Sequence, residues 1–489
     1  MKKDTKHIAG RLIVAFWLLA CGPVPVAAEQ LTLDRALEMA FAQSPTVQQA
    51  ALSLAISERN LKAQQAALKS QFSLSITPYE YSKSRVFNEL ISQYIDQEQT
   101  GSSAELSIIQ PIKWTDGTLS IVESIDWREA ASSYTGSVKE TTYGNSLFLR
   151  FNQPLFTYNR TMMALKELRL ALENARLDFA IQKLQIESQV TEQFLNLYYT
   201  QRSVDIAREE YANATESYEI IVGKVDAGIS AREELFQADL TQADSRASLE
   251  NIQIQYENNL DNFKILLGLP LDTSFEIVAD VRKLLVEVDL NQAVEHGLRR
   301  RMELRQQDIA IENAINDLIR TGAENEFKGS VDLTYGLTGT DEEFDDLYRS
   351  PTRDQSVALN FIIPLFDWGE KKHRLAASQA EVESRRLSAA ELEKQIVYEI
   401  RQAYRNLQNQ KTQIEIAEKN VTNARLTYDI NLERYKNGDL SSKDISFYQT
   451  QLSREQLNEV SALINYQVAL LDLKIRTLWD FVQKRSVVE

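Results

Sequence analysis

The chain repeats part of itself at an interval of 210 residues. Three landmarks keep this interval: Pro154-Leu155-Phe156 with Pro364-Leu365-Phe366, Asn196-Leu197 with Asn406-Leu407, and Gly228 with Gly438. A single register held over 75 residues indicates a tandem duplication. The fold must therefore be built from two similar halves.

Upstream of Pro-Leu-Phe the register changes. The segment Leu33-Asp34-Arg35-Ala36 best matches Leu290-Asn291-Gln292-Ala293, which is a shift of 257 residues. The first half therefore carries 47 extra residues between about position 80 and position 145. We predict a first repeat over residues 29–286 and a second repeat over residues 287–489.

Each Pro-Leu-Phe precedes an unusually long helical pattern. Apolar residues recur at spacings of three and four, as in a coiled-coil seam: Leu165, Leu168, Leu172, Ala175 and Phe179. The pattern runs over residues 158–225 and again over 367–435, roughly 100 Å each at about 1.5 Å per residue. Gly228 and Gly438 stand where they would cap these helices. Helices of this length form an extended bundle or a wall, not a compact globule.

The segments before each Pro-Leu-Phe alternate between apolar and polar residues, as strands do. We predict four strands, and two more in the surplus, where a hairpin over about residues 104–127 would turn at Asp116-Gly117. Alternating strands of about ten residues in an exported protein indicate an outer-membrane barrel. Four to six strands are fewer than the roughly eight that close one, so subunits must combine. Three copies give twelve strands, or eighteen if the extra hairpin joins the wall.

The N-terminus has the features of an export signal. Lys2, Lys3, Lys6 and Arg11 precede the apolar run from Leu12 to Ala20, which is too short to span a bilayer. Val26-Ala27-Ala28 offers a cleavage site, so we expect residues 1–28 to be removed. In an alternative reading, Leu18-Leu19-Ala20-Cys21 is a lipobox and Cys21 carries a lipid.

Composition excludes several function classes. The net charge of −16 argues against a nucleic-acid binder, which needs basic patches to neutralise phosphates. The single cysteine permits no intramolecular disulfide. After cleavage the histidines are His296 and His373, in no metal-binding spacing, and no nucleophile motif or phosphate loop is present. We expect neither an enzyme nor a bound metal or cofactor.

The architecture resembles the TolC-like outer-membrane efflux proteins. The resemblance covers about residues 31–480 and rests on Leu31-Thr32-Leu33-Asp34-Arg35-Ala36-Leu37, the two Pro-Leu-Phe segments, and Arg434-Tyr435-Lys436-Asn437-Gly438. It implies a mainly α-helical, duplicated subunit with membrane β-strands. Three copies would form a β-barrel in the Gram-negative outer membrane, continued by an α-helical tunnel in the periplasm.

The resemblance also implies partners. Such channels are the exit ducts of tripartite efflux or type I secretion systems, working with a periplasmic adaptor protein and an inner-membrane transporter. An alternative reading, an exported periplasmic coiled-coil adaptor or scaffold, explains the heptads and the charge but not the paired strands.

Four residues carry over as candidate channel residues. Acidic residues that follow the second glycine ring the pore in the family; Asp444 matches the first ring, whereas Phe447 occupies the position of the second. Tyr435 matches a tyrosine that latches the closed state, with Glu234 as its acidic partner. The arginine expected two residues after the second glycine is Leu440 here, so the latch is only partly kept.

Each candidate also has a structural explanation. Ser441 and Asp444 have capping-box spacing, and an acid in the first turn of a helix complements the helix dipole. Glu234 holds a similar position after Gly228. Tyr435 is equally compatible with packing at a helix end.

Overall fold

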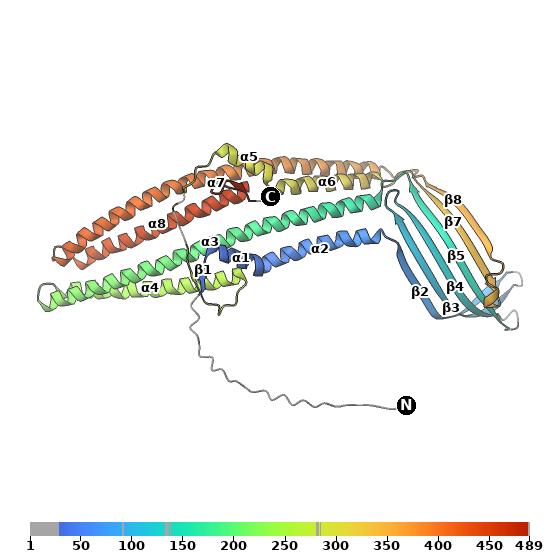
Figure 1. The fold of residues 1–489 in the computed structure, drawn as a ribbon, viewed down its shortest axis with the longest axis horizontal. Helices are drawn as coiled ribbons and strands as arrows, with labels where there is room; N and C mark the ends of the chain where they lie inside the picture. Colours follow the sequence, from blue (N-terminus) through green and yellow to red (C-terminus); the bar gives the residue numbers. More distant parts are fainter. Residues whose placement is uncertain are drawn as a thin grey trace, which may run out of the picture.

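The computed structural model describes residues 29–89, 92–132, 136, 138–279, 283 and 285–487. The molecule is elongated, with a helical bundle at one end and a curved sheet at the other (Figure 1). Cys21 and the predicted signal segment, residues 1–28, lie outside the described residues. No helix of the described part is both long enough and apolar enough to cross a membrane.

Four long helices repeat at the interval seen in the sequence. Helices α3 (Arg160–Asp226) and α7 (Glu370–Lys436) have 67 residues each, and α4 (Arg232–Leu267) and α8 (Ser442–Thr477) have 36 each. The predicted duplication of long helices is therefore confirmed. In each half the long helix reverses at the end of the bundle farthest from the sheet and returns as the shorter one (Figure 1).

Shorter elements complete the bundle. Helix α2 packs along α3 on the sheet side of the molecule, and α6 packs along α7 in the same way. Strands β1 and β6 pair in parallel, and β9 and β10 pair in antiparallel fashion. The bounds of these elements are β1 Glu29–Leu31, α1 Leu33–Gln43, α2 Pro45–Ala67, β6 Phe275–Ile277, α5 Leu290–Arg300, α6 Met302–Gly322, β9 Trp479–Asp480 and β10 Arg485–Ser486.

The sheet has six antiparallel strands in the order β2-β3-β4-β5-β7-β8. Their bounds are β2 Gln71–Asn88, β3 Gln93–Ile112, β4 Gly117–Ser132, β5 Lys139–Leu155, β7 Lys328–Asp341 and β8 Thr352–Ile362, with the 3₁₀ turn η2 Phe344–Asp346 between the last two. Strands β5 and β8 lead into α3 and α7. The sheet of one subunit is open, with β2 at one edge and β8 at the other (Figure 1).

The predicted extra hairpin is present and forms part of the six-stranded sheet. It consists of β3 and β4, which are longer than the predicted 104–127 and lie between β2 and β5. Its turn lies at the end where the helices begin, because Asn159, the N-cap of α3, donates from Nδ2 to the carbonyl oxygen of Lys113 at 2.8 Å. The sequence left open whether the hairpin joins its neighbours, because alternation along a strand does not fix which strands pair; the structure places it within the sheet.

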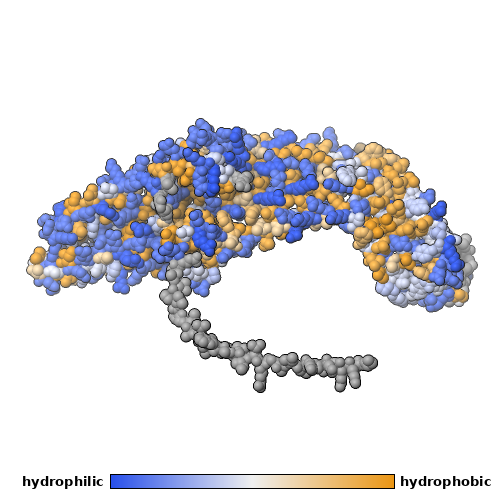
Figure 2. Space-filling model, in the orientation of Figure 1, coloured by the Kyte–Doolittle hydropathy of each residue, from blue (hydrophilic) through white to orange (hydrophobic). Residues whose placement is uncertain are grey.

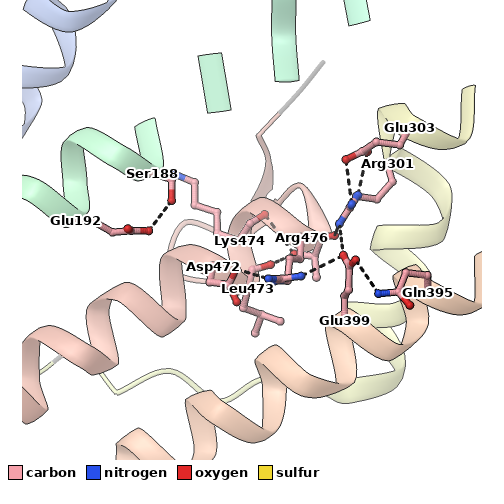
Figure 3. A network of polar contacts seen from close by, with 11 residues as sticks. Ser188, Glu192, Arg301, Glu303, Gln395, Glu399, Asp472, Leu473, Lys474 and Arg476 are labelled. Carbon is pink, nitrogen blue, oxygen red and sulfur yellow. Dashed lines mark hydrogen bonds and ion pairs between the residues drawn. The ribbon is translucent and has the colours of Figure 1, made fainter. Parts of the chain in front are cut away.

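Packing within the bundle is apolar, with an ion-pair network at its middle. A buried cluster from α5, α7 and α8 includes Ile400, Leu407 and Leu473. Beside it, the carboxylate of Glu399 contacts the guanidinium groups of both Arg301, at 3.4 Å, and Arg476, at 3.1 Å (Figure 3). One acid therefore joins the start of α6, the middle of α7 and the end of α8.

Candidate channel constriction at the helix reversals

Both helix reversals use the same backbone device. Gly228 and Gly438 have φ angles of 76° and 87°, in the left-handed region that favours glycine. The nitrogen of the residue after each glycine donates back to a helix carbonyl, Ile229 to Lys224 at 2.8 Å and Asp439 to Arg434 at 2.9 Å. These two reversals, together with the first turns of α4 and α8, are called the tip below.

Tyr435 links the two halves at the tip. Its side chain is fully buried, in a cluster with Ile221, Ala238 and Ile445. Its hydroxyl donates to the carbonyl oxygen of Ser217 on α3 at 3.1 Å. Burial raises the pKa of Tyr435, and the nearby negative charge of Glu234 adds to the rise. The phenol is therefore held protonated and able to donate.

Lys224 is a second link that the sequence reading missed. Its Nζ donates to the backbone carbonyl of Tyr435 at 2.9 Å and lies 4.8 Å from the centre of the tyrosine ring, within cation–π range. Lys224 stands four residues before Gly228, as Arg434 stands four residues before Gly438. A comparison of the two repeats for shared basic residues would have found it.

Glu234 lies in the first turn of α4, and its backbone nitrogen donates to the carbonyl of Ala231 at 3.1 Å. Its carboxylate influences Tyr435 electrostatically, while the tyrosine hydroxyl uses Ser217 as its acceptor. The structure thus brings the two predicted latch residues near each other but gives Tyr435 a different hydrogen-bond partner. The latch between them stays a prediction.

Asp444 closes a capping box at the start of α8. Its backbone nitrogen donates to Ser441 Oγ at 3.3 Å, and Ser441 Oγ donates to the Asp444 carboxylate at 2.6 Å. The side chain is exposed, so the cap does not remove it from solvent. Phe447 is also exposed, at 61%, and packs edge-on against Tyr448. The capping explanation is therefore observed, and the pore position of Asp444 and Phe447 stays a prediction.

Nothing at the tip resembles a catalytic or metal centre. Within the described ranges, no group of three or more His, Cys, Asp or Glu side chains is placed to hold a metal ion. The tip places the exposed Asp444 and the half-exposed Glu234 near the buried ring of Tyr435, at the end of the bundle farthest from the sheet.

The comparisons with known proteins agree with this architecture. Residues 323–475 match the outer membrane efflux protein family. No curated protein sequence matches the chain significantly.

Solved structures of outer-membrane channels share the whole fold. The outer membrane protein VceC of Vibrio cholerae superposes with a TM-score of 0.68 at 15% identity, covering 91% of this chain and 95% of that one. The CmeC outer membrane channel of Campylobacter jejuni gives 0.66 at 16% identity, covering 94% and 87%. The open MtrE outer membrane channel of Neisseria gonorrhoeae gives 0.63 at 14% identity, covering 91% and 88%.

The chain therefore has the fold of outer-membrane channel proteins, and part of its second half is similar in sequence to the outer membrane efflux protein family.

Proposed function

We propose that three copies of this chain form a continuous duct across the outer membrane and periplasm. The duct is the exit channel of a tripartite efflux or type I secretion system, and it receives substrates from an inner-membrane transporter through a periplasmic adaptor protein. The observation that carries this proposal is that each subunit has two complementary open edges.

The helical edges expose apolar side chains at matching heights. Helix α4 lies at one edge and α7 at the other (Figure 1). Phe236 and Leu240, four and eight residues after the start of α4, are 69% and 55% exposed. Ile430 and Leu426, six and ten residues before the end of α7, are 63% and 57% exposed. Large exposed apolar side chains gathered at an edge indicate a protein interface.

The exposed apolar residues of α4 and α7 also match in height closer to the sheet. Ile254 of α4 lies 22 residues from the tip end of its helix, and Ile416 of α7 lies 20 residues from the same end. At about 1.5 Å per residue these heights agree within roughly 3 Å. An edge of this kind does not complement itself, so neighbours join head to tail and the assembly closes as a ring.

The coiled-coil adaptor reading leaves the sheet unexplained. A periplasmic spacer does not require a six-stranded sheet whose two edge strands, β2 and β8, each have one side without a partner strand. The sheet therefore favours the channel.

The test is the mass and conductance of the assembly. Protein extracted from outer membranes in detergent should have three times the mass of the mature subunit, and it should form ion-conducting pores in planar bilayers. A matched pair of variants, Phe236→Asp and Lys224→Gln, separates the interface from the tip: the first should dissociate the trimer, and the second should leave it intact. A soluble periplasmic monomer without pore activity would contradict the proposal.

A further inference from the structure

We propose that the outer-membrane segment is an eighteen-stranded barrel with a wide aqueous lumen, which passes large hydrophilic solutes of the size of a polypeptide chain or a small domain. The inference rests on the proposed trimer and concerns the width of its membrane wall. It starts from the extra hairpin, which takes part in the sheet over the full length of its neighbours.

The hairpin is paired on both sides. Strand β3 pairs with β2 from Gln71↔Ile109 to Asn88↔Gln93, and β4 pairs with β5 from Thr118↔Asn152 to Ala131↔Lys139. Without the hairpin, the positions of β2 and β5 would be three strand spacings, or about 14 Å, apart, which is too far for the two strands to pair. The wall is continuous only if the hairpin belongs to it.

The hairpin also keeps the two-faced pattern of a membrane wall. One face presents apolar side chains in a row that crosses the inserted strands: Phe72, Ile108, Ile121, Leu149 and Tyr335. The other face is more polar near the helices, where one row contains Gln71, Ile109, Ser120, Arg150 and Thr334. The next row on that face is mixed: Ser73, Ser107, Val122, Phe148 and Gly336. Glu123 is an acid on the apolar face. Figure 2 shows apolar residues gathered on the sheet near the helices.

The turn of the hairpin is locked to the tunnel helix. Asp116 Oδ2 contacts Arg160 Nε at 2.9 Å, and Gln153 Nε2 donates to the carbonyl of Thr115 at 2.7 Å. Arg160 is the first residue of α3. The inserted strands therefore begin at the same level as the tunnel and cannot swing away from the wall without breaking this junction.

Strand β2 of one copy and strand β8 of the next can pair in a register that keeps their apolar side chains on one face. Strand β2 starts and β8 ends at the helix side, so flush pairing between neighbouring copies sets Phe72 opposite Phe361, Leu74 opposite Leu359 and Ile76 opposite Val357. All six side chains then lie on the apolar face, as directly opposed residues must. They are between 50% and 74% exposed in the single subunit.

This register gives a normal barrel. Within one subunit, the row of paired residues that starts at Phe72 on β2 ends at Gln355 on β8. Between subunits, the proposed pairing places Phe361 opposite Phe72. Each row therefore shifts by six residues along the strand direction per subunit. Six residues of about 3.3 Å over six spacings of about 4.8 Å correspond to a strand tilt of roughly 35°, within the usual range. Eighteen strands at this tilt enclose a backbone diameter of about 35 Å, against about 23 Å for twelve.

An eighteen-stranded wall leaves an aqueous channel, as porins of similar strand number do. The lumen after side chains are counted is roughly 25 Å wide. Selection among substrates therefore falls to the helical tunnel and its tip, because the membrane segment is too wide to discriminate.

The first experiment counts strands. Electron cryomicroscopy of the trimer in lipid nanodiscs should show eighteen strands in cross-section. The double variant Leu74→Cys/Leu359→Cys should yield a covalent trimer on mild oxidation, and the control Leu74→Cys/Ala358→Cys, which puts the thiols on opposite faces, should not. The chain's own cysteine, Cys21, lies in the predicted signal segment.

The second experiment measures width without involving the tip. Thr334→Cys should react from the outside with a maleimide-polyethylene glycol about 20 Å across, a size that an eighteen-stranded lumen admits. Deletion of residues 93–132, which removes two strands and preserves chain direction, should reduce this labelling at least tenfold while a small maleimide still reacts. Leu333→Cys, on the opposite face, is the control.

A trimer that conducts but shows twelve strands, or that excludes the large reagent, would overturn the wide barrel and leave the proposed channel standing. Absence of a trimer would overturn both.

Discussion

The carboxylate of Asp116 accepts two hydrogen bonds from Thr161, one from its backbone nitrogen at 3.1 Å and one from its hydroxyl at 2.6 Å. The first residue lies in the turn between β3 and β4, and the second lies in the first turn of α3. A negative charge at a helix N-terminus is favoured by the helix dipole. One side chain thus joins the six-stranded sheet to helix α3.

Replacing Asp116 should loosen that junction. Asp116→Asn keeps a residue that tolerates the φ of 60° but removes the charge, and should cost about 1 kcal/mol. Asp116→Ala adds backbone strain and should cost about 2–3 kcal/mol. Thermal denaturation of the assembly measures both. Equal stability of all three proteins would contradict the role of the junction.

The same carboxylate predicts a pH effect. Burial opposes ionisation of Asp116, but hydrogen bonds from Thr161 and Arg160 outweigh it and lower the pKa. A carboxyl group with a lowered folded pKa contributes stability above its unfolded pKa, about 3.9, and loses it as the pH falls through the folded value. The difference between the native protein and Asp116→Asn should therefore be largest at neutral pH and vanish in strong acid.

Asp444 and Ser441 allow the pore role to be separated from the cap. Asp444→Asn removes the charge, whereas Ser441→Ala removes the capping hydroxyl and keeps the charge. If three copies of Asp444 ring the pore, Asp444→Asn should lower cation selectivity and the block by divalent ions in single-channel recordings. Ser441→Ala should leave both unchanged and cost about 1 kcal/mol of stability. The reverse pattern would assign Asp444 to capping alone.

Tyr435→Phe should weaken the contact between α7 and α3 at the tip. The variant removes one hydrogen bond to Ser217, worth about 1 kcal/mol, without creating a cavity. Because Tyr435 joins α7 to α3, we expect a higher mean conductance or more frequent opening. Tyr428→Phe, two turns earlier on the same helix and half-buried, is the matched control and should conduct like the native channel. Unchanged gating in Tyr435→Phe would show that the buried ring alone holds the tip.

Glu399→Gln should weaken the middle of the bundle. The substitution leaves the guanidinium groups of Arg301 and Arg476 close together without their shared acid (Figure 3). Hydrogen bonds to charged groups contribute roughly 1.5–3 kcal/mol, so we expect a loss of about 2 kcal/mol in chemical denaturation. Glu393→Gln, on an exposed face of α7, should change stability by less than about 0.5 kcal/mol.

Periodicity was enough to predict the long helices and the strands, because both depend on local alternation of apolar and polar residues. It also located the Asp116-Gly117 turn. It could not reveal that this turn contacts Thr161, which lies 45 positions further along the chain, because the residues between them fold back as strands β4 and β5. The same holds for Tyr435 and Ser217, and for Arg301 and Glu399. Contacts between residues far apart in sequence leave no periodic signal, so the tip and the ion-pair network needed coordinates.

The insertion of β3 and β4 has a consequence for how such channels diversify. A hairpin enters and leaves the sheet at the same end, so β5 still runs toward α3 and the helices keep their direction and their interval of 210 residues. A single added strand would invert everything downstream. In the proposed barrel, strands added in pairs enlarge the membrane opening and leave the direction of the long helices unchanged.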